Sequence, residues 1–254
     1  MDTIDDFQLL IDLHRPNPRQ GPGSEAATLL ALELSGLLGR HALQIADLGC
    51  GTGASTITLA ERLDGHITAV DLFPQFLDVL GDRARAHGVE SRITTLAASF
   101  DALPFAPASL DAIWSEGAIY NLGFEAGLTL WRPFLKPGGV LAVSEITWLT
   151  AQRPAEIQSH WDVHYPEIDL ASGKIAALER NGFTPIGYFP LPESCWLENY
   201  YQPLQARFSA LLEQYDHSDA AKACVEAEER EIELYTRHRA HLSYGFYVAQ
   251  KTTE

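Results

Sequence analysis

The chain has 254 residues, with 18 Lys and Arg against 34 Asp and Glu, so its formal net charge is −16. Hydrophobic residues make up 46% and charged residues 20%, which is typical of a globular protein and argues against a disordered or fibrous chain. So acidic a surface repels phosphate, and we therefore expect no nucleic-acid partner. No uncharged apolar run reaches the ~20 residues of a membrane-spanning helix, so we expect no membrane partner.

The cysteines indicate a reducing compartment. Cys50, Cys195 and Cys224 are odd in number, and their spacing fits neither a disulfide framework nor a zinc site. The first residues, 1–6, are acidic where a signal peptide is basic, and no apolar segment follows them. We therefore expect a cytoplasmic protein.

Elements are predicted in chain order from turn residues and from β-prone runs. Residues 15–23 are rich in Pro and Gly and predict a loop, after which Ser24 is a suitable N-cap for a helix through about Leu38. Short β-prone runs then alternate with helix-like stretches, at Gln44–Leu48, Ile67–Val70, Ile93–Leu96, Leu110–Trp114 and Val140–Ser144. This alternation predicts an α/β fold with a parallel, doubly wound sheet.

Two later runs, 184–190 and 244–250, are aromatic and β-branched, and they bracket a helical region. If they pair with each other, the second runs antiparallel at one edge of the sheet. In the helical region, Glu226–Arg230 and Glu233–Arg237 are spaced as on an exposed helix face. We predict one domain over residues 1–254, made of an N-terminal helical lid (1–40), a cofactor-binding core (41–190), a helical insertion (191–243) and a last strand (244–251).

The most informative segment is a glycine-rich loop. Residues 45–54 read IADLGCGTGA, in which an apolar strand is followed by Gly49, Gly51 and Gly53 and then by a helix. Glycines allow a tight turn and the close approach of a ligand to the backbone, and the helix N-terminus offers unpaired N–H groups. Asp71 follows the next strand, where a carboxylate can accept both hydroxyl groups of a ribose. The segment therefore predicts a nucleoside-containing ligand.

Two cofactors compete for this loop. Gly49, Gly51 and Ala54 satisfy the nicotinamide fingerprint, whose last glycine can be alanine. Asp47, however, stands immediately before the loop, where it would repel a pyrophosphate but favours a cationic ligand. A turn with the sequence LKPGG at 135–139 precedes the fifth strand. These two features favour S-adenosylmethionine over a nicotinamide.

Four motifs in order carry a family resemblance. The pattern DxGxGxG at 47–53, Asp71, the segment LPF at 103–105 and the LKPGG turn together resemble class I S-adenosylmethionine-dependent methyltransferases, closest to the small-molecule branch called type 11. The resemblance covers about residues 25–145. It implies a Rossmann-like, doubly wound, seven-stranded sheet, mostly parallel with an antiparallel terminal hairpin, and S-adenosylmethionine as the cofactor.

The resemblance also assigns roles to individual residues. Asp47 and Gly49 would face the methionyl part of the cofactor, Asp71 the ribose, and Leu72 the adenine. Ser99 and Phe100 would meet the adenine edge, although Ser99 stands where the family usually has Asp. The remaining cofactor-binding candidates of the resemblance are Gly51, Gly53 and Glu116. Independently of it, Arg19 in the N-terminal loop is either a bidentate clamp on the cofactor carboxylate or a solvated side chain, and we favour the clamp.

The acceptor is less well defined, since methyl transfer needs mainly alignment, desolvation and, for a protonated nucleophile, a base. The motif for amine methylation on bases and a Pro-Cys nucleophile are both absent, which favours a small-molecule acceptor with an O, N or S nucleophile. Glu116 or His160 is the predicted base, and Tyr120 belongs to an aromatic lid. Glu116 could instead bind the cofactor ammonium. His160 and His164 lack the metalloprotease Glu between them, and we predict no metal.

Three rival functions remain open at this point. They are a non-catalytic module that binds S-adenosylmethionine, aminopropyl transfer in the same pocket, and an NAD-dependent oxidoreductase. A homodimer is also left open.

Overall fold

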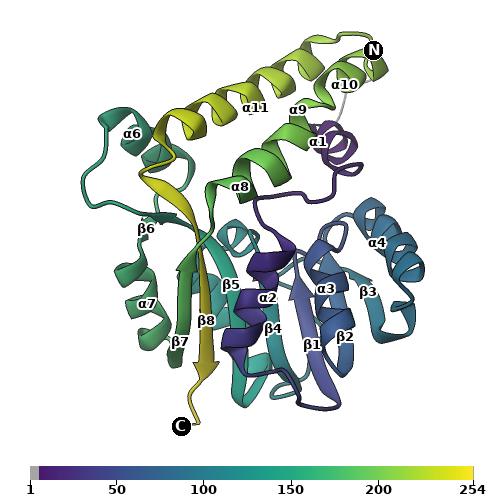
Figure 1. The fold of residues 1–254 in the computed structure, drawn as a ribbon, viewed down its shortest axis with the longest axis vertical. Helices are drawn as coiled ribbons and strands as arrows, with labels where there is room; N and C mark the ends of the chain where they lie inside the picture. Colours follow the sequence, from purple (N-terminus) through teal and green to yellow (C-terminus); the bar gives the residue numbers. More distant parts are fainter. Residues whose placement is uncertain (1–5, 254) are drawn as a thin grey trace.

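A mixed β-sheet, flanked by helices, forms the centre of the computed structural model, which describes residues 6–253 (Figure 1). Its strands are β1 (Leu43–Leu48), β2 (Gly65–Asp71), β3 (Ile93–Ala97), β4 (Leu110–Glu116), β5 (Leu135–Trp148), β6 (Asp169–Leu170), β7 (Phe183–Pro190) and β8 (Leu242–Lys251). The longer helices are α1 (Asp6–His14), α2 (Glu25–Ser35), α3 (Ala54–Arg62), α4 (Pro74–His87), α5 (Phe124–Trp131), α6 (Ala155–His164), α7 (Ala171–Arg180), α10 (Phe208–Gln214) and α11 (Asp219–His238). Shorter helical segments are α8 (Glu193–Trp196), α9 (Gln202–Gln205), η1 (Glu90–Arg92), η2 (Ile119–Asn121), η3 (Arg132–Phe134) and η4 (Leu197–Tyr201).

The sheet has the strand order β3-β2-β1-β4-β5-β8-β7, with the two-residue strand β6 paired to the end of β5. The strands from β3 to β5 along this order are parallel, and β8 is antiparallel to both of its neighbours. This confirms the predicted Rossmann-like, doubly wound sheet of seven mostly parallel strands. The additional strand β6 is too short to leave a periodic signal in the sequence.

The expected position of the last strand is wrong, because β8 lies inside the sheet and β7 forms the edge. The side chains explain this order. Residues on both faces of β8 are buried over most of its length, as in an interior strand, whereas β7 alternates between exposed and half-buried positions. β7 also contains Pro185 and Pro190, which lack a backbone N–H and are tolerated at a sheet edge.

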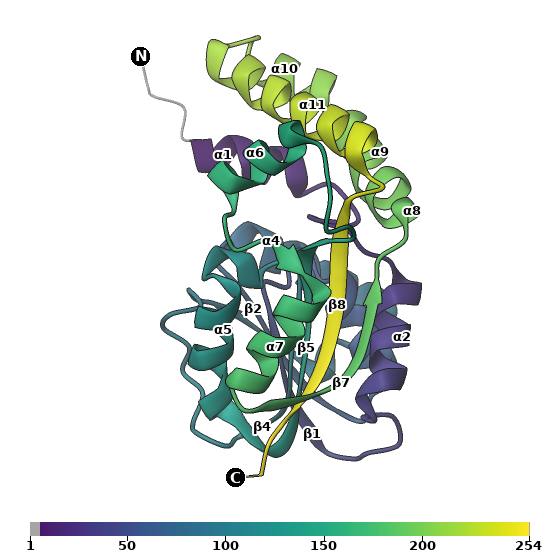
Figure 2. The ribbon, with the colours of Figure 1, turned by 90° about the vertical axis from the view of Figure 1, so that its left-hand side faces the viewer.

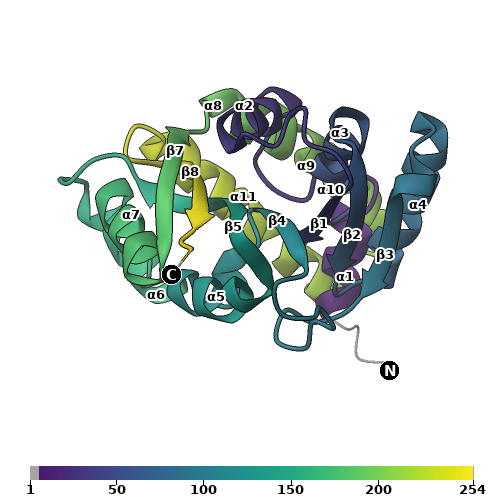
Figure 3. The same cartoon turned by 90° about the horizontal axis from the view of Figure 1, so that it is seen from below.

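Helices cover both faces of the sheet (Figure 3). α2 and α3 lie on one face and α5 and α7 on the other, and each layer buries its own apolar cluster. Leu32 and Leu59 belong to the first cluster, and Leu128 and Trp131 to the second. α2 begins at its predicted N-cap, Ser24, whose side chain accepts a hydrogen bond from the Ala27 N–H. It ends at Gly36, shortly before the predicted end.

A second group of helices lies above the carboxyl ends of the parallel strands (Figure 2). We call this group the cap; it consists of α1, α6 and the segments from α8 to α11. α1 is held against the insertion by Asp12, which accepts hydrogen bonds from the Gln214 amide and the Tyr215 hydroxyl, both at 2.8 Å. The described part of the predicted lid (1–40) is divided between two places. α2 packs on the sheet, whereas α1 and the loop that follows it contribute to the cap. Within residues 6–253, no helix combines the length and the apolar character needed to cross a membrane.

Candidate functional site

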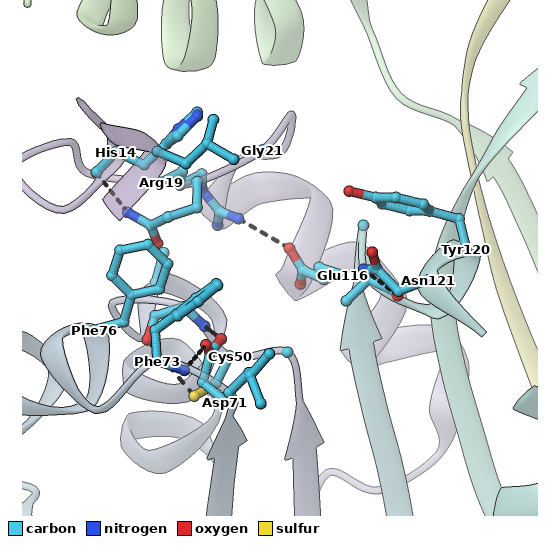
Figure 4. Close-up of a pocket in the computed structure, with 18 of the residues that line it drawn as sticks. His14, Arg19, Gly21, Cys50, Asp71, Phe73, Phe76, Glu116, Tyr120 and Asn121 are labelled. Carbon is cyan, nitrogen blue, oxygen red and sulfur yellow. Dashed lines mark hydrogen bonds and ion pairs between the residues drawn. The ribbon is translucent and has the colours of Figure 1, made fainter. Parts of the chain in front are cut away.

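A cavity of about 590 Å³ lies between the carboxyl edge of the sheet and the cap. Its sheet side is formed by residues at or after the ends of β1, β2, β3 and β4, of which Cys50, Asp71 and Glu116 are labelled in Figure 4, and its cap side by residues of α1 and α11. Ligands of open α/β sheets bind outside the carboxyl ends of the strands, so the cavity lies where the fold predicts a site. The predicted site residues that line it are Arg19, Gly49, Gly51, Asp71, Leu72, Ser99, Phe100, Glu116 and Tyr120.

The glycine loop needs glycine for both conformation and space. Gly49, Gly51 and Gly53 have φ angles of 73°, 54° and 87°, in the region that disfavours other residues. A Cβ atom on Gly49 would lie 2.3 Å from the Cβ atom of Ala118, and one on Gly53 would lie 2.1 Å from Cδ1 of Leu80. Gly49 and Gly51 line the cavity, whereas Gly53 packs against α4 beneath it.

Asp47 lies under this loop and is fully buried. Its Oδ2 accepts hydrogen bonds from the hydroxyls of Ser55, at 2.9 Å, and Thr56, at 2.6 Å, both in the first turn of α3. Its Oδ1 has no hydrogen-bond partner among the described residues. Burial raises the pKa of this carboxyl to about 7, although the two hydroxyls oppose the rise. Asp47 does not line the cavity itself, so its direct contact with a ligand remains a prediction.

Asp71 supports the glycine loop from the end of β2. Its Oδ2 accepts a hydrogen bond from the Gly51 N–H at 2.8 Å, and its Oδ1 accepts one from the Phe73 N–H at 3.0 Å. Burial raises the pKa of Asp71, and these backbone donors oppose the rise. Leu72, 56% exposed, lies beside it on the cavity wall with Ser99. The structure thus places the predicted nucleoside-binding residues on one wall.

Glu116, at the end of β4, is fully engaged in hydrogen bonds. Its Oε1 accepts from the Thr28 hydroxyl at 2.7 Å and from the Trp114 indole N–H at 2.9 Å. Its Oε2 lies 2.9 Å from Nη1 of Arg19, and this ion pair is drawn in Figure 4. Charge-assisted hydrogen bonds of this kind are roughly twice as strong as neutral ones. Arg19 and Glu116 are thus fixed opposite the glycine loop.

Two residues that sequence reasoning missed hold the N-terminal loop on the glycine loop. Oε1 of Gln20 accepts hydrogen bonds from the N–H of Thr52, at 2.8 Å, and from its hydroxyl, at 3.0 Å. Nη1 of Arg83, on α4, donates to the Thr52 hydroxyl at 2.6 Å and to the Pro18 carbonyl at 3.0 Å. A polar residue within a Pro- and Gly-rich loop was the available signal for Gln20. No local pattern distinguishes Arg83 from other surface arginines.

The cap side of the cavity is aromatic and acidic. Tyr200 and His14 line it together with Glu228 and Glu231 of α11, and Tyr120, in η2 after β4, lines the opposite side. The two glutamates lie in the helix that the sequence predicts to have an exposed, charged face, and that prediction holds for Glu226 and Glu233. Glu228 and Glu231 are half-buried because they flank the buried positions Val225 and Ile232. Their closeness to that apolar stripe was the signal that could have found them.

His160, one of the two predicted bases, lies outside the cavity. It is on α6, where its ring stacks on that of His164 with a centroid distance of 4.1 Å. Burial and the nearby His164 lower its pKa. No contact in the described structure supports His160 as a base, and that role remains a prediction. Among residues 6–253 no three His, Cys, Asp or Glu side chains are grouped as metal ligands.

Comparison with known proteins relates the chain to methyltransferases. Residues 45–139 match a family described as "Methyltransferase domain". The chain is 28% identical over 142 residues to 27-O-demethylrifamycin SV methyltransferase from Amycolatopsis mediterranei, an alignment that covers 53% of this chain and 50% of that protein. The chain spans about half the length of most of the curated relatives it matches.

Two solved structures share the fold over nearly the whole chain. One is a S-adenosylmethionine-dependent methyltransferase from Geobacter sulfurreducens in complex with S-adenosyl-L-homocysteine, with a TM-score of 0.79, 20% identity, and coverage of 98% of this chain and 99% of that one. The other is the [4+2]-cyclase SpnF, with a TM-score of 0.75, 19% identity, and coverage of 98% and 94%. The family match over residues 45–139 and the likeness in fold over nearly the whole chain agree with the sheet order and the glycine loop, and the chain is similar to class I S-adenosylmethionine-dependent methyltransferases.

Proposed function

We propose that the protein transfers a methyl group from S-adenosylmethionine to an O, N or S nucleophile of a small molecule. The observation that carries this proposal is the cavity in which the glycine loop, Asp71 and the Arg19–Glu116 ion pair lie together at the carboxyl ends of β1, β2 and β4. When bound, S-adenosylmethionine supplies a methyl group already activated by its sulfonium.

The residues present fit this cofactor. Asp71 would accept hydrogen bonds from the ribose hydroxyls, and Leu72 with Phe100 would enclose the adenine. Arg19 would hold the carboxylate and Glu116 the ammonium of the methionyl part, each a pairing of opposite charges. The unpartnered Oδ1 of Asp47, buried under the glycine loop, is an acceptor that a nearby donor would complete.

The chain's own contribution to the reaction is alignment and the exclusion of water. The rate of an in-line displacement falls steeply when the nucleophile and the methyl group are slightly misaligned. Rigid positioning of the two reactants therefore matters more here than acid–base chemistry. The hydrogen bonds of Glu116, and those that Gln20 and Arg83 make with Thr52, hold the residues around the cavity in place. Of the two predicted bases, Glu116 lines the cavity and remains a candidate for accepting a proton from the nucleophile, and Tyr120 remains a candidate for the aromatic lid.

The cavity has to contain a nucleoside cofactor as well as the acceptor, and its volume of about 590 Å³ therefore favours a small acceptor. The similarity to SpnF is a reason to test transfer directly, because that protein has the same fold and is described as a [4+2]-cyclase. A silent cofactor-binding module is the second alternative to be excluded.

Isothermal titration with S-adenosylmethionine, S-adenosylhomocysteine and NAD, followed by turnover assays, tests the proposal. We expect the first two ligands to bind and NAD not to bind, and S-adenosylhomocysteine to be released in the presence of an acceptor. Binding of NAD without the other two would contradict the assignment. Cofactor binding without release on a broad panel of O, N and S nucleophiles would favour the silent module.

Two further expectations belong to the proposal. A cytoplasmic location is supported by the odd number of cysteines and by their spacing, which fits no disulfide framework. A homodimer remains a prediction, to be tested by light scattering after size-exclusion chromatography.

A further inference from the structure

The carboxylates that line the cavity divide into two groups. Asp71 accepts hydrogen bonds from backbone N–H groups, and Glu116 is paired with Arg19, so both are committed on the sheet side. Glu228 and Glu231 face the cavity from α11, one helical turn apart, on the cap side. The roles that we propose for the cofactor leave these two carboxylates unused.

Neither glutamate has a strong cationic partner. Oε1 of Glu228 lies 3.8 Å from Nε2 of His14, and Oε1 of Glu231 accepts a hydrogen bond from the Tyr201 hydroxyl at 3.1 Å. Apart from Arg19, no Lys or Arg is among the described residues that line the cavity. Burial, followed by the charge of Glu228, raises the pKa of Glu231, and the hydrogen bond from Tyr201 and the charges of His14 and His164 oppose the rise.

Tyr200 provides an independent observation on the same wall. It lines the cavity, it is only 9% exposed, and its hydroxyl has no hydrogen-bond partner among the described residues. Its ring stacks on His14 with a centroid distance of 6.1 Å and an interplanar angle of 13°. Tyr120 lies across the cavity with its hydroxyl directed inwards (Figure 4). The Tyr200 hydroxyl oxygen thus lies among aromatic rings and carboxylates, and such surroundings are suited to a positively charged group.

We propose that the cap side of the cavity binds the acceptor through a positively charged nitrogen, held by Glu228 and Glu231 and enclosed by Tyr120 and Tyr200. This inference rests on the proposed function, because it assigns the substrate class of the same cavity. Aromatic rings attract organic cations through their π faces, and carboxylates add to that attraction inside a partly desolvated site. The same carboxylates repel an anionic acceptor.

The test uses the full-length protein saturated with S-adenosylhomocysteine and a matched pair of probes. Choline carries a quaternary ammonium, and 3,3-dimethyl-1-butanol has the same shape with carbon in place of the charged nitrogen. In titrations at millimolar concentration, we expect choline to bind about tenfold more tightly than the alcohol, as for ring-enclosed cations. The variants Glu228→Gln and Glu231→Gln should each reduce choline affinity roughly fivefold without changing affinity for S-adenosylhomocysteine.

The control is Glu229→Gln, which removes the same charge from an exposed position of the same helix, outside the cavity. It should leave choline affinity unchanged. Equal binding of both probes, or equal losses in Glu229→Gln and Glu231→Gln, would overturn the proposal. Failure of the protein to bind S-adenosylhomocysteine in the first step would instead count against the proposed function, so the two failures are distinguishable.

Discussion

Arg19 and Glu116, 97 residues apart in the chain, form an ion pair whose Nη1 and Oε2 atoms lie 2.9 Å apart. The pair joins the N-terminal loop to the carboxyl end of β4, and its side chains are 12% and 8% exposed. Breaking a buried pair by removing one partner is costly, because the other charge is left uncompensated. This relationship makes the loop part of the site.

Arg19→Ala is therefore expected to reduce affinity for S-adenosylhomocysteine at least tenfold and to lower the free energy of unfolding by about 3 kcal/mol. Calorimetric titration and urea unfolding measure the two effects. The control is Arg15→Ala in the same loop, since Arg15 is 47% exposed and lies 4.0 Å from Asp12. Unchanged affinity in Arg19→Ala would exclude the clamp.

Glu116→Gln separates binding from proton transfer. Both oxygens of Glu116 already accept hydrogen bonds, so we expect the variant to lose cofactor affinity, roughly tenfold, as the ion pair with Arg19 becomes neutral. At saturating cofactor, kcat should stay close to that of the wild type. The opposite split, normal affinity with lost turnover, would identify Glu116 as the base.

Gly49→Ala tests the packing of the glycine loop. The new Cβ atom would meet the Cβ atom of Ala118 at 2.3 Å in addition to straining the backbone, so we expect a loss of roughly 2–3 kcal/mol in the free energy of unfolding. Gly39 has a φ angle of 80° but nothing within 4 Å of an added Cβ atom. Gly39→Ala therefore reports the backbone strain by itself, and equal losses in the two variants would contradict the steric argument.

Asp47 should make stability fall as the pH rises. Its pKa is about 7 in the folded protein and 3.8 in the absence of burial, so between these values the folded state keeps a proton that the unfolded state has released. Raising the pH through this window therefore favours unfolding, and this loss of stability is complete above about pH 7. Asp47→Asn removes this titration.

The stability of Asp47→Asn relative to the wild type should accordingly rise by on the order of 1 kcal/mol or more between pH 5 and pH 8, measured by urea unfolding. Asp78→Asn, a change at an exposed carboxylate, is the control. A difference between Asp47→Asn and the wild type that does not vary with pH would show that Asp47 is ionised throughout.

A second buried pair tests the packing of α7 on the sheet. Nζ of Lys174 lies 3.4 Å from Oε1 of Glu145 and 4.5 Å from the centre of the Phe124 ring, and the two charged side chains are 3% and 0% exposed. Lys174→Met should cost about 3–5 kcal/mol in urea unfolding, because Glu145 loses its counterion. Adding Glu145→Gln should recover most of that loss, and a purely additive double variant would contradict the coupling.

The sequence predicted the elements that have a strong local signal. β1 to β4 were placed within about two residues of their observed ends, because buried parallel strands are short apolar runs between turn residues. The order of the last two strands was wrong because pairing depends on which strand is buried on both faces. The spacing of apolar residues along each strand does not show which strand is interior, because both strands are rich in aromatic residues.

The site was predicted unevenly for a similar reason. Gly49 directly follows β1, and Asp71 and Glu116 are the last residues of β2 and β4, so the topology fixes them at one edge of the sheet. Gln20 and Glu231 reach the cavity through contacts between segments far apart in the chain. Such contacts leave no periodic pattern, and the three-dimensional packing of the cap determines them.

The anchoring of α1 also bears on how the chain is assembled as it is synthesised. Asp12 is bound by Gln214 and Tyr215, more than 200 residues later, and His14 lies beside Glu228. The ribosome releases this segment before the strands β1 to β5, and its partners at 214, 215 and 228 emerge only after those strands. The parallel sheet can therefore form while the N-terminal segment still waits for its partners, and the ligand cavity is completed as one of the last events of folding.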